Sequence, residues 1–271
     1  EGVLRICKIC DVPAVIAVRR DATLAGSLIN ALIAAGQEDD FIDPKGALPI
    51  ISQRTLCIVV DTYQLGLVES REILEKCGKV AVIDHHRKGV GFIEKADLVC
   101  HEPYASSASE LVTEFLQYVG DRDDKPNRIE AEGLLSGIML DTRDFTLHTG
   151  VRTFEAAAAL RRYGAETEHV RQLFDVSMVE YTTKARLVSE AQMYRGCAIT
   201  VSGEVAPEAR VAIAQAANDL LTIQNVEASF VAVQVGGGVN ISARSLGAVN
   251  VQVIMESLGG GGHQTLSLIH I

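Results

Sequence analysis

The sequence has no tryptophan, and aromatic residues fill only 5% of its 271 positions. Proteins that bind single-stranded nucleic acids stack the bases on aromatic side chains, so this function is disfavoured. The sequence also lacks an excess of basic residues, because 25 lysines and arginines face 35 aspartates and glutamates, a formal net charge of −10. Long nucleic acid is therefore disfavoured as a partner, whereas an acidic protein binds a small phosphate ester when metal ions supply the positive charge.

Long apolar runs and a signal peptide are missing too, so the sequence predicts no membrane span. Cysteine is sparse, and the six residues at 7, 10, 57, 77, 100 and 197 are typical of small core residues in a reducing compartment. Cys7 and Cys10 form a C-x-x-C without a second pair of ligands, so a helix face explains them better than a zinc or redox site. Hydrophobic residues reach 48%, enough for a sizeable core.

The most informative stretch is K-V-A-V-I-D-H-H at residues 79–86. Its four apolar residues, 80–83, predict a short buried strand, and Asp84, His85 and His86 follow at the end of that strand. In an open α/β sheet, ligands bind at the carboxyl ends of the strands. A carboxylate with two imidazoles suits a divalent metal or a phosphate group, although a polar loop explains an isolated Asp-His-His equally well.

The same arrangement recurs at two other places. The apolar run 56–60 ends in Asp61, and residues 131–140, whose apolar side chains are spaced for one helix face, are followed by Asp141. Each acid taken alone is explained as a cap or a turn residue. Three acids placed at the ends of elements, with His85 beside one of them, predict a metal site.

Strands and helices alternate along the first part of the chain, which predicts an α/β fold with a parallel sheet and right-handed crossovers. We expect this domain to cover residues 1–175, a long linker helix 176–195, and a smaller α+β domain 196–271. Glycines 236–238 predict a hairpin turn. The expected strands are 14–18, 56–60, 80–83, 98–100, 197–201, 228–235 and 239–243, and the expected helices are 1–10, 24–35, 68–77, 109–118, 131–140, 152–163, 176–193, 206–221 and 249–257.

Two further segments are candidates for phosphate binding. Ser106 or Ser107 lies where it caps the following helix, whose N-terminal amides suit a phosphate, although capping alone explains both serines. The glycines 259–262, next to His263, allow close approach to an anion, although a flexible linker is the more common explanation. Arg244 follows a strand and would complete a phosphate clamp, although a surface arginine is usually only solvated.

Together these motifs resemble the DHH phosphoesterase superfamily with its DHH-associated second domain. The most similar subfamily is that of the GdpP-type cyclic di-AMP phosphodiesterases of Firmicutes-like bacteria. The resemblance covers nearly the whole chain, from residue 12 to residue 263. It rests on V-I-D-H-H-R at 82–87, V-D-T at 60–62, E-P-Y-A-S-S at 102–107, L-D-T at 140–142, S-A-R-S at 242–245 and G-G-G-G-H at 259–263.

The resemblance implies a role for each matching residue. Asp61 would bridge two manganese ions, and His85 and Asp141 would bind the second of them. His86 would face the substrate phosphate, while Asp84 would orient a histidine. Two such ions activate a water for in-line attack on phosphorus, here on one phosphodiester of cyclic di-AMP, with linear pApA as the product.

The implied partner is a small cyclic dinucleotide and not long nucleic acid, while a homodimer stays open. Ser106 and Ser107 are candidate substrate ligands of the first domain. Full-length family members carry membrane helices and regulatory domains, which implies the cytoplasmic side of the bacterial plasma membrane. In the second domain, the resemblance implies substrate binding by Arg244, Gly260, Gly261, Gly262 and His263.

Two departures from the family bear on activity. Family members supply further metal ligands from an H-x-x-P-D-x-D motif after their first strand, and no such motif precedes Ala14. Residues 264–271 are also unlike the small-residue helix and closing strand that complete the family's second domain. We therefore expect a fragment shortened at both ends, which binds at most one divalent ion well and has little or no hydrolase activity.

Two other functions stay open. A nuclease for very short oligonucleotides or a phosphatase for adenosine bisphosphate belongs to the same superfamily and needs no cleft that accepts a closed ring. A non-catalytic nucleotide sensor, or a dimerisation module with a structural metal site, would bind nucleotide without turnover.

Overall fold

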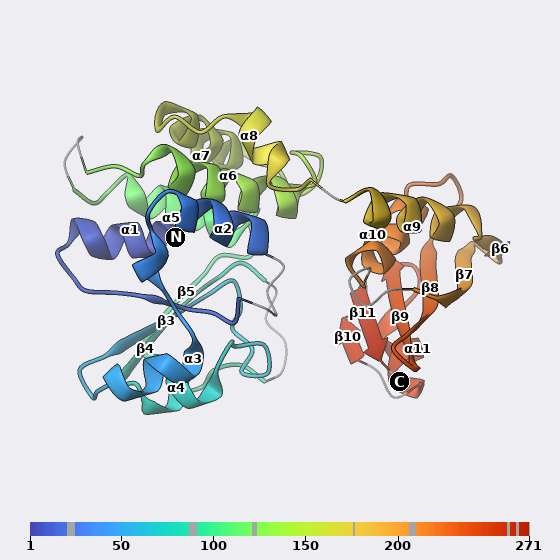
Figure 1. Cartoon of the computed structure of the whole chain (residues 1–271), viewed down its shortest axis with the longest axis horizontal. Coiled ribbons are helices and arrows are strands. Elements are labelled where there is room, and N and C mark those ends of the chain that lie inside the picture. Colours follow the sequence, from blue (N-terminus) through green and yellow to red (C-terminus); the bar gives the residue numbers. More distant parts are fainter. Residues whose placement is uncertain are drawn as a thin grey trace. The chain divides into compact units, whose positions relative to one another are not determined.

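The computed structural model describes residues 1–20, 25–86, 91–120, 124–175, 177–205, 210–258, 261–263 and 266–270. The chain forms two compact units, Glu1–Asp175 and Val176–Ile271, and each is described by itself (Figure 1). The α/β fold class predicted from the sequence is confirmed, because the first unit has a parallel sheet and the second a mixed sheet with helices. Among the described residues, no helix combines the length and the apolar character that a membrane crossing requires.

The strands of the first unit are β1 (Ile16–Ala17), β2 (Phe41–Ile42), β3 (Leu56–Val60), β4 (Lys79–Asp84) and β5 (Leu98–His101). Strands β3, β4 and β5 form a parallel sheet, while β1 and β2 pair separately, also in parallel. The register pairs Val60 with Ile83 and Asp84 with His101. The carboxyl ends of the three strands therefore meet at one edge, where the polar residues follow.

Helices cover both faces of this sheet. In Figure 1, α5, α6 and α7 lie on one side of β3–β5, while α3 and α4 lie on the other. Strand β4 is buried along most of its length, as is typical of a central strand covered by helices on both faces. The helices of this unit are α1 (Gly2–Ile9), α2 (Gly26–Ala34), α3 (Pro44–Ala47), α4 (Arg71–Lys76), α5 (Ala108–Leu116), α6 (Arg128–Thr142), α7 (Val151–Arg162) and α8 (Thr167–Gln172).

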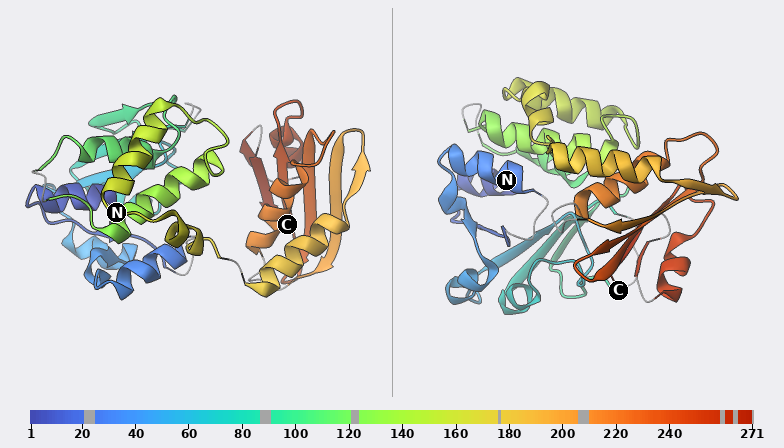
Figure 2. Two further views of the ribbon diagram at one scale, coloured as in Figure 1. Left: turned by 90° about the horizontal axis from the view of Figure 1, so that it is seen from above. Right: turned by 45° about the vertical axis from the view of Figure 1, so that its right-hand side comes forward.

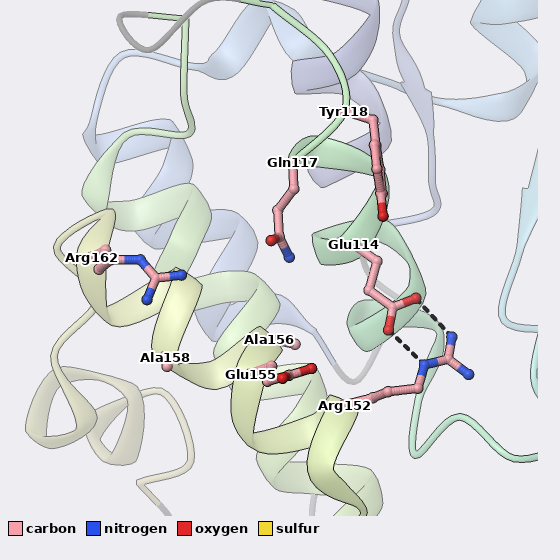
Figure 3. A pocket seen from close by; sticks show the side chains of 8 residues that line it. All are labelled: Glu114, Gln117, Tyr118, Arg152, Glu155, Ala156, Ala158 and Arg162. Atoms are coloured by element: carbon pink, nitrogen blue, oxygen red, sulfur yellow. Dashed lines mark hydrogen bonds and ion pairs between the residues drawn. The ribbon is translucent and has the colours of Figure 1, made fainter.

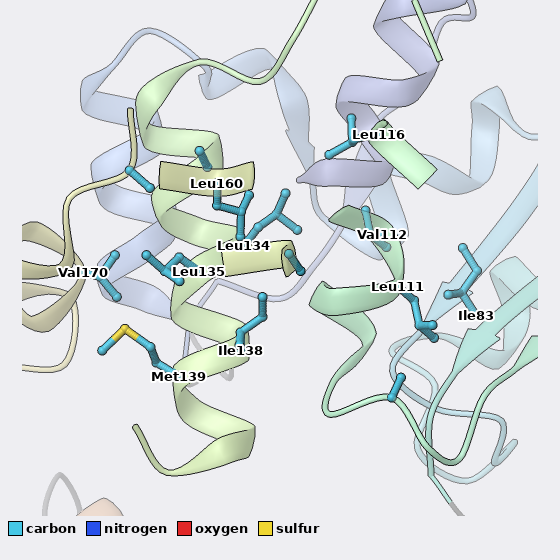
Figure 4. Close-up of a cluster of buried hydrophobic side chains, with 14 residues drawn as sticks. Ile83, Leu111, Val112, Leu116, Leu134, Leu135, Ile138, Met139, Leu160 and Val170 are labelled. Atoms are coloured by element: carbon cyan, nitrogen blue, oxygen red, sulfur yellow. The ribbon is translucent and has the colours of Figure 1, made fainter. Parts of the chain in front are cut away.

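The largest core of the first unit lies between the sheet and helices α5 to α8. Leu111 and Leu116 of α5 pack with Leu135 and Ile138 of α6, and Ile83 of β4 closes the cluster on the sheet side (Figure 4). The helical side chains lie on the inward faces of α5 and α6, and Ile83 lies on the inward face of β4. One apolar cluster therefore joins these helices to the sheet. This packing fixes the C-terminus of α6 relative to the end of β4.

The second unit contains a mixed sheet in the order β10-β11-β9-β8-β7-β6. Helices α9 and α10 cover one face and α11 the other, as Figure 2 shows. The predicted glycine turn is present, with left-handed φ at Gly236 and Gly237 between antiparallel β8 and β9. The elements are α9 (Met178–Ser189), β6 (Gln192–Tyr194), β7 (Cys197–Glu204), α10 (Arg210–Leu220), β8 (Ala228–Val235), β9 (Gly238–Ser245), α11 (Val251–Ser257), β10 (Gly261–His263) and β11 (Leu266–His270).

The prediction of one long helix over 176–193 is wrong. Helix α9 ends at Ser189, and residues 192–194 form β6, which pairs with β7 through the turn at Arg195 and Gly196. Helix α9 also packs against α10 through Leu187, so it is part of the second unit rather than a free linker. No proline separates this helix from M-Y-R-G at residues 193–196, and the apolar residues continue the helical spacing, so the local pattern favours a longer helix.

Candidate metal centre

Asp61 stands at the carboxyl end of β3 in a left-handed conformation, with φ of 67°. Its backbone N–H donates to the carbonyl of Ile83 over 2.9 Å, which extends the β3–β4 pairing by one residue. Aspartate tolerates this conformation better than most residues because its short polar side chain bonds locally. The next hydroxyl, of Thr62, accepts from the backbone N–H of Gln64, so it stabilises the following turn.

Asp84 ends β4 and is completely buried. Its Oδ1 accepts the backbone N–H groups of His85 and His86 at 2.8 and 3.2 Å, and the Nδ1–H of His86 at 2.7 Å. These hydrogen bonds hold His86 in one orientation and engage its Nδ1. Burial alone would raise the pKa of Asp84, but the hydrogen bonds from His86 outweigh it and lower the pKa.

His85 points its Nε2 at two carboxylates. The Nε2 atom lies 3.3 Å from Oδ1 of Asp61 and 3.6 Å from Oδ2 of Asp141. It is buried, yet it has no hydrogen-bond partner. The other ring nitrogen, Nδ1, lies 3.3 Å from the carbonyl oxygen of Ala105. Donation from Nδ1 to that carbonyl leaves a lone pair on Nε2, which is the arrangement of a metal-binding histidine.

Asp141 reaches the site from the last turn of α6. The helix ends at Thr142, and Arg143 continues in a left-handed conformation with φ of 47°. The Thr142 hydroxyl donates to the carbonyl of Ile138 and accepts the N–H of Phe145. Thr142 therefore fixes the end of the helix, and the carboxylate of Asp141 faces Nε2 of His85.

The proton affinities of the site reflect this convergence. Burial, together with the neighbouring carboxylate of Asp61, raises the pKa of Asp141 to about 6. Burial lowers the pKa of His85, but the carboxylates of Asp61 and Asp141 outweigh it, and the net shift is upward. The carboxylate of Asp84 raises the pKa of His86. Two acids held this close, with an imidazole between them, are a favourable place for a cation.

The residues present fit a divalent metal. Potential ligand atoms of Asp61, His85 and His86 all lie within 4.8 Å of one another. Among the residues that the structure describes, this is the one group of three or more such ligands. Asp141 adds a second carboxylate beside the same His85 nitrogen. Mixed carboxylate and imidazole donors suit divalent first-row metals. The buried, unpartnered Nε2 of His85 is the specific sign that a ligand belongs there.

The two candidate serines face inward. Ser106 and Ser107 are buried, and their hydroxyls are engaged by a helix acid that the sequence analysis did not single out, Glu110. Ser107 Oγ accepts the N–H of Glu110, and Ser106 Oγ donates to Oε2 of Glu110 over 2.6 Å. Capping, the alternative explanation, therefore accounts for Ser107, whereas the hydroxyl of Ser106 is engaged by the carboxylate of Glu110. Their assignment to substrate remains only a prediction.

In the second unit, Arg244 is buried on β9. Its Nε donates to Asn218 of α10, and its Nη1 donates to Ser242 and to the carbonyl of Ala243. Gly261, Gly262 and His263 form strand β10, antiparallel to β11, whereas Gly260 lies outside the described residues. Hydrogen bonds within the second unit therefore hold the guanidinium of Arg244 in one orientation.

An arginine that the sequence analysis passed over organises the acids behind the site. Arg152 of α7 makes a two-pronged ion pair with Glu114, and Glu102 and Glu110 also lie within 4.0 Å of its guanidinium. Figure 3 shows the Arg152–Glu114 pair in a hollow between α5 and α7. The signal for Glu110 was the S-x-x-E pattern of a capped helix start at 107–110.

Comparison with known proteins gives a consistent picture. The model of the DHH family, N-terminal domain, matches residues 16–138, and the model of the DHHA1 domain matches residues 205–269. The chain is 51% identical over 226 residues to the cyclic-di-AMP phosphodiesterase GdpP of Geobacillus thermodenitrificans, covering 83% of this chain and 34% of that protein. It is 42% identical over 273 residues to GdpP of Bacillus subtilis, covering 97% of this chain and 41% of that protein.

The chain therefore spans well under half the length of these curated relatives. An exopolyphosphatase-related protein from Bacteroides fragilis has a similar fold, with a TM-score of 0.79 at 18% identity, over 98% of this chain and 80% of that one. The DHH match covers strands β3 to β5, whose ends lead into Asp61, Asp84 and both histidines, and the DHHA1 match covers strands β8 to β11, including Arg244 on β9. The chain belongs to the DHH family, with an N-terminal DHH domain followed by a DHHA1 domain.

Proposed function

We propose that this chain is the hydrolytic part of a phosphodiesterase that converts cyclic di-AMP into linear pApA. The observation that carries the proposal is the convergence of Asp61 and Asp141 on the unpartnered Nε2 of His85. Relatives between 42% and 51% identical are named cyclic-di-AMP phosphodiesterases, which supports the choice of substrate.

Asp61, His85 and Asp141 would hold the divalent cation, which we propose to be Mn²⁺. When bound, such an ion supplies Lewis-acid activation of water and stabilises charge on a phosphoryl group. The protein contributes the fixed geometry, because each of the three ligands sits at the rigid end of a strand or a helix. Two ions would occupy the complete family site.

His86 is assigned to the substrate phosphate. Its ring is half-exposed, and Asp84 occupies its Nδ1, so Nε2 is the nitrogen that can donate to a phosphate oxygen. Because Asp84 raises the pKa of His86, more of the imidazole stays protonated near neutral pH, and that form carries the positive charge a phosphate favours. Asp84 is thus the orienting carboxylate.

Arg244, Gly260, Gly261, Gly262 and His263 are assigned to substrate binding by the second unit, on the strength of the family resemblance. The fixed guanidinium of Arg244 supports this assignment, because a charge-assisted hydrogen bond to phosphate gains from a preset direction. The same resemblance assigns the protein to the cytoplasmic side of the bacterial plasma membrane, as part of a longer chain.

The test is a hydrolysis assay with Mn²⁺ on four substrates: cyclic di-AMP, pApA, a short oligonucleotide and adenosine bisphosphate. It uses the chain alone and a chimera that adds the segment preceding the matched region of the Bacillus subtilis relative. We expect the chimera to form pApA from cyclic di-AMP. Cleavage of the linear substrates only would favour the nuclease or phosphatase, and binding without turnover would favour a nucleotide sensor.

A further inference from the structure

Glu110 is a buried acid that the proposed reaction does not use. It lies in the first turn of α5 and is 1% exposed. Burying a carboxylate is costly unless it is paired and hydrogen-bonded. The partners of the Glu110 carboxylate therefore indicate its structural role. One of them, Ser106, belongs to the segment that precedes α5 and directly follows Ala105, which contacts His85.

The carboxylate of Glu110 accepts two hydrogen bonds from Ser106. Oε2 accepts the Ser106 hydroxyl at 2.6 Å and the Ser106 backbone N–H at 3.2 Å. The Arg152 guanidinium lies 4.0 Å from the other oxygen, Oε1, and offsets the charge. An ordinary capping box would return the acid to the N–H of the cap residue itself, which here is Ser107. Glu110 instead reaches one residue further back, to Ser106.

The residue directly before Ser106 is the one that contacts His85. The carbonyl of Ala105 belongs to the same peptide unit as the Ser106 N–H that Glu110 holds. That carbonyl lies 3.3 Å from Nδ1 of His85, and Ala105 is itself buried. A planar peptide has no rotation of its own, so fixing its N–H also fixes the direction of its C=O.

We propose that Glu110 is a positioning residue for the metal centre. It locks the Ala105–Ser106 peptide so that the carbonyl accepts the Nδ1–H of His85. This favours a proton on Nδ1 of His85 and leaves the Nε2 lone pair for the cation that Asp61 and Asp141 would share. The inference rests on the proposed function for its metal, but the link between Glu110 and the His85 tautomer holds in the metal-free protein.

The first measurement is made on the metal-free chain. The ¹⁵N shifts of the His85 ring at a pH where the imidazole is neutral report which nitrogen carries the proton. We expect the Nδ1–H form to be more populated in the wild type and in Glu110→Gln, whose amide oxygen still accepts from Ser106, than in Glu110→Ala. In Glu110→Ala the carboxylates of Asp61 and Asp141 draw more of the proton to Nε2.

The second measurement is the affinity for Mn²⁺ by titration calorimetry. Groups that orient a ligating histidine typically change metal affinity by about 10- to 100-fold, so we expect Glu110→Ala to bind Mn²⁺ at least about tenfold more weakly. Glu110→Gln should restore binding close to the wild type. Ser106→Ala, which keeps the N–H donor and loses only the hydroxyl, should fall between them.

A control separates positioning from loss of a helix cap. Ser70 caps α4 by accepting the N–H of Ile73, so Ser70→Ala weakens the same unit at another helix start. This control should lower the melting temperature without changing the His85 tautomer or the Mn²⁺ affinity. If Glu110→Ala lowers the melting temperature in the same way and leaves both readouts unchanged, Glu110 only caps α5 and the proposal is overturned.

The two proposals fail in different ways. If the wild-type chain and the chimera bind no divalent ion, the proposed function fails, while the tautomer comparison still decides the role of Glu110. If Glu110→Ala is too unstable to measure, Ser106→Ala decides it. A Ser106→Ala variant whose share of the Nδ1–H tautomer and Mn²⁺ affinity both equal those of the wild type would then reject the positioning role.

Discussion

Asp84 and His86 form a carboxylate–imidazole pair in which Oδ1 and Nδ1 are 2.7 Å apart, while the second carboxylate oxygen, Oδ2, is buried without a partner. The acid is completely buried and the imidazole is half-exposed. The buried carboxylate therefore orients the exposed imidazole and favours its protonated form. Its two residues are separated by His85 alone, which faces the other carboxylates.

Replacement of Asp84 by Asn should lower the pKa of His86. The structure raises this pKa chiefly through the Asp84 hydrogen bond, and an amide exerts no comparable attraction on the imidazolium. An NMR titration of the metal-free protein, with Asp144→Asn as a charge-matched control in an exposed loop, measures the shift. We expect a decrease towards the ordinary histidine value in Asp84→Asn and none in the control; equal values in all three proteins would contradict the pairing.

His85→Ala and Asp141→Asn should each weaken Mn²⁺ binding by about 100-fold or more, because both remove a direct ligand rather than a group that orients one. Calorimetry on the folded variants measures the affinity, and circular dichroism confirms the fold. Asp144→Asn again serves as the control, since Asp144 lies in the loop directly after α6 and is exposed. Wild-type affinity in Asp141→Asn would remove that residue from the site.

The chain should bind a single divalent ion tightly. The described residues contain one cluster of candidate ligands, and Asp61, His85 and Asp141 are the three that we assign to the ion. Equilibrium dialysis followed by elemental analysis counts the bound ions. Two tightly held ions per chain would show that ligands for a second ion exist beyond this cluster.

Glu130 should make the first unit lose stability in acid. Its carboxylate is 1% exposed and accepts from Arg5, Gln37 and Asn127. Burial raises its pKa, but the hydrogen bonds from Arg5 and Asn127 outweigh it, so the folded pKa lies below the unfolded value. The stabilisation is therefore complete above the unfolded pKa of about 4.5 and is lost as the pH falls through the lower, folded pKa.

Denaturant unfolding at pH 6 and at pH 4 tests this. Breaking a buried ion pair typically costs about 3–5 kcal/mol, so Glu130→Gln should be less stable by that order at pH 6. The difference from the wild type should shrink at pH 4. Glu155→Gln, an exposed acid on α7, should change little at either pH. A pH-independent loss in Glu130→Gln would mean that shape and not charge matters at this position.

Gly78→Ala should destabilise the strand that carries Asp84 and both histidines. A Cβ at residue 78 would lie 1.9 Å from the backbone carbonyl oxygen of Gln53, and backbone atoms have little room to retreat. Overpacking of this kind costs about 1–3 kcal/mol or more. Gly66→Ala, whose nearest contact is 3.9 Å away on a flexible arginine, is the matched control. Thermal unfolding of both variants measures the difference, and equal melting temperatures would contradict it.

The sequence predicted those parts of the protein that local pattern decides. Strand β3 has the predicted bounds, and β4 and β5 differ from them by only one or two residues, because short apolar runs ending in polar residues leave little choice. Asp61 and His85 lie together as expected, since the carboxyl ends of neighbouring parallel strands must meet. Asp141 joins them because the apolar cluster packs the end of helix α6 against β4.

The sequence failed where tertiary contacts decide. Strand β6 exists because it pairs with β7, and no local signal separates Gln192–Tyr194 from the helix before it. Glu110 and Glu130 are helix acids by pattern, and acids on helices are normally exposed. Their burial depends on Ser106 and Arg5, which lie on other segments, so only the S-x-x-E and N-x-x-E spacings hinted at their roles.

The left-handed backbone at Asp61 restricts what evolution or an engineer can place there. Short polar residues and glycine occupy this region readily, while a residue with a longer or branched side chain is strained in it. Exchanging Asp61 for glutamate would lengthen the side chain that reaches the cation. The longer residue would be strained in the left-handed conformation of the main chain, whatever its effect on coordination. The left-handed backbone at residue 61 therefore limits how long the metal-binding side chain at this position can be.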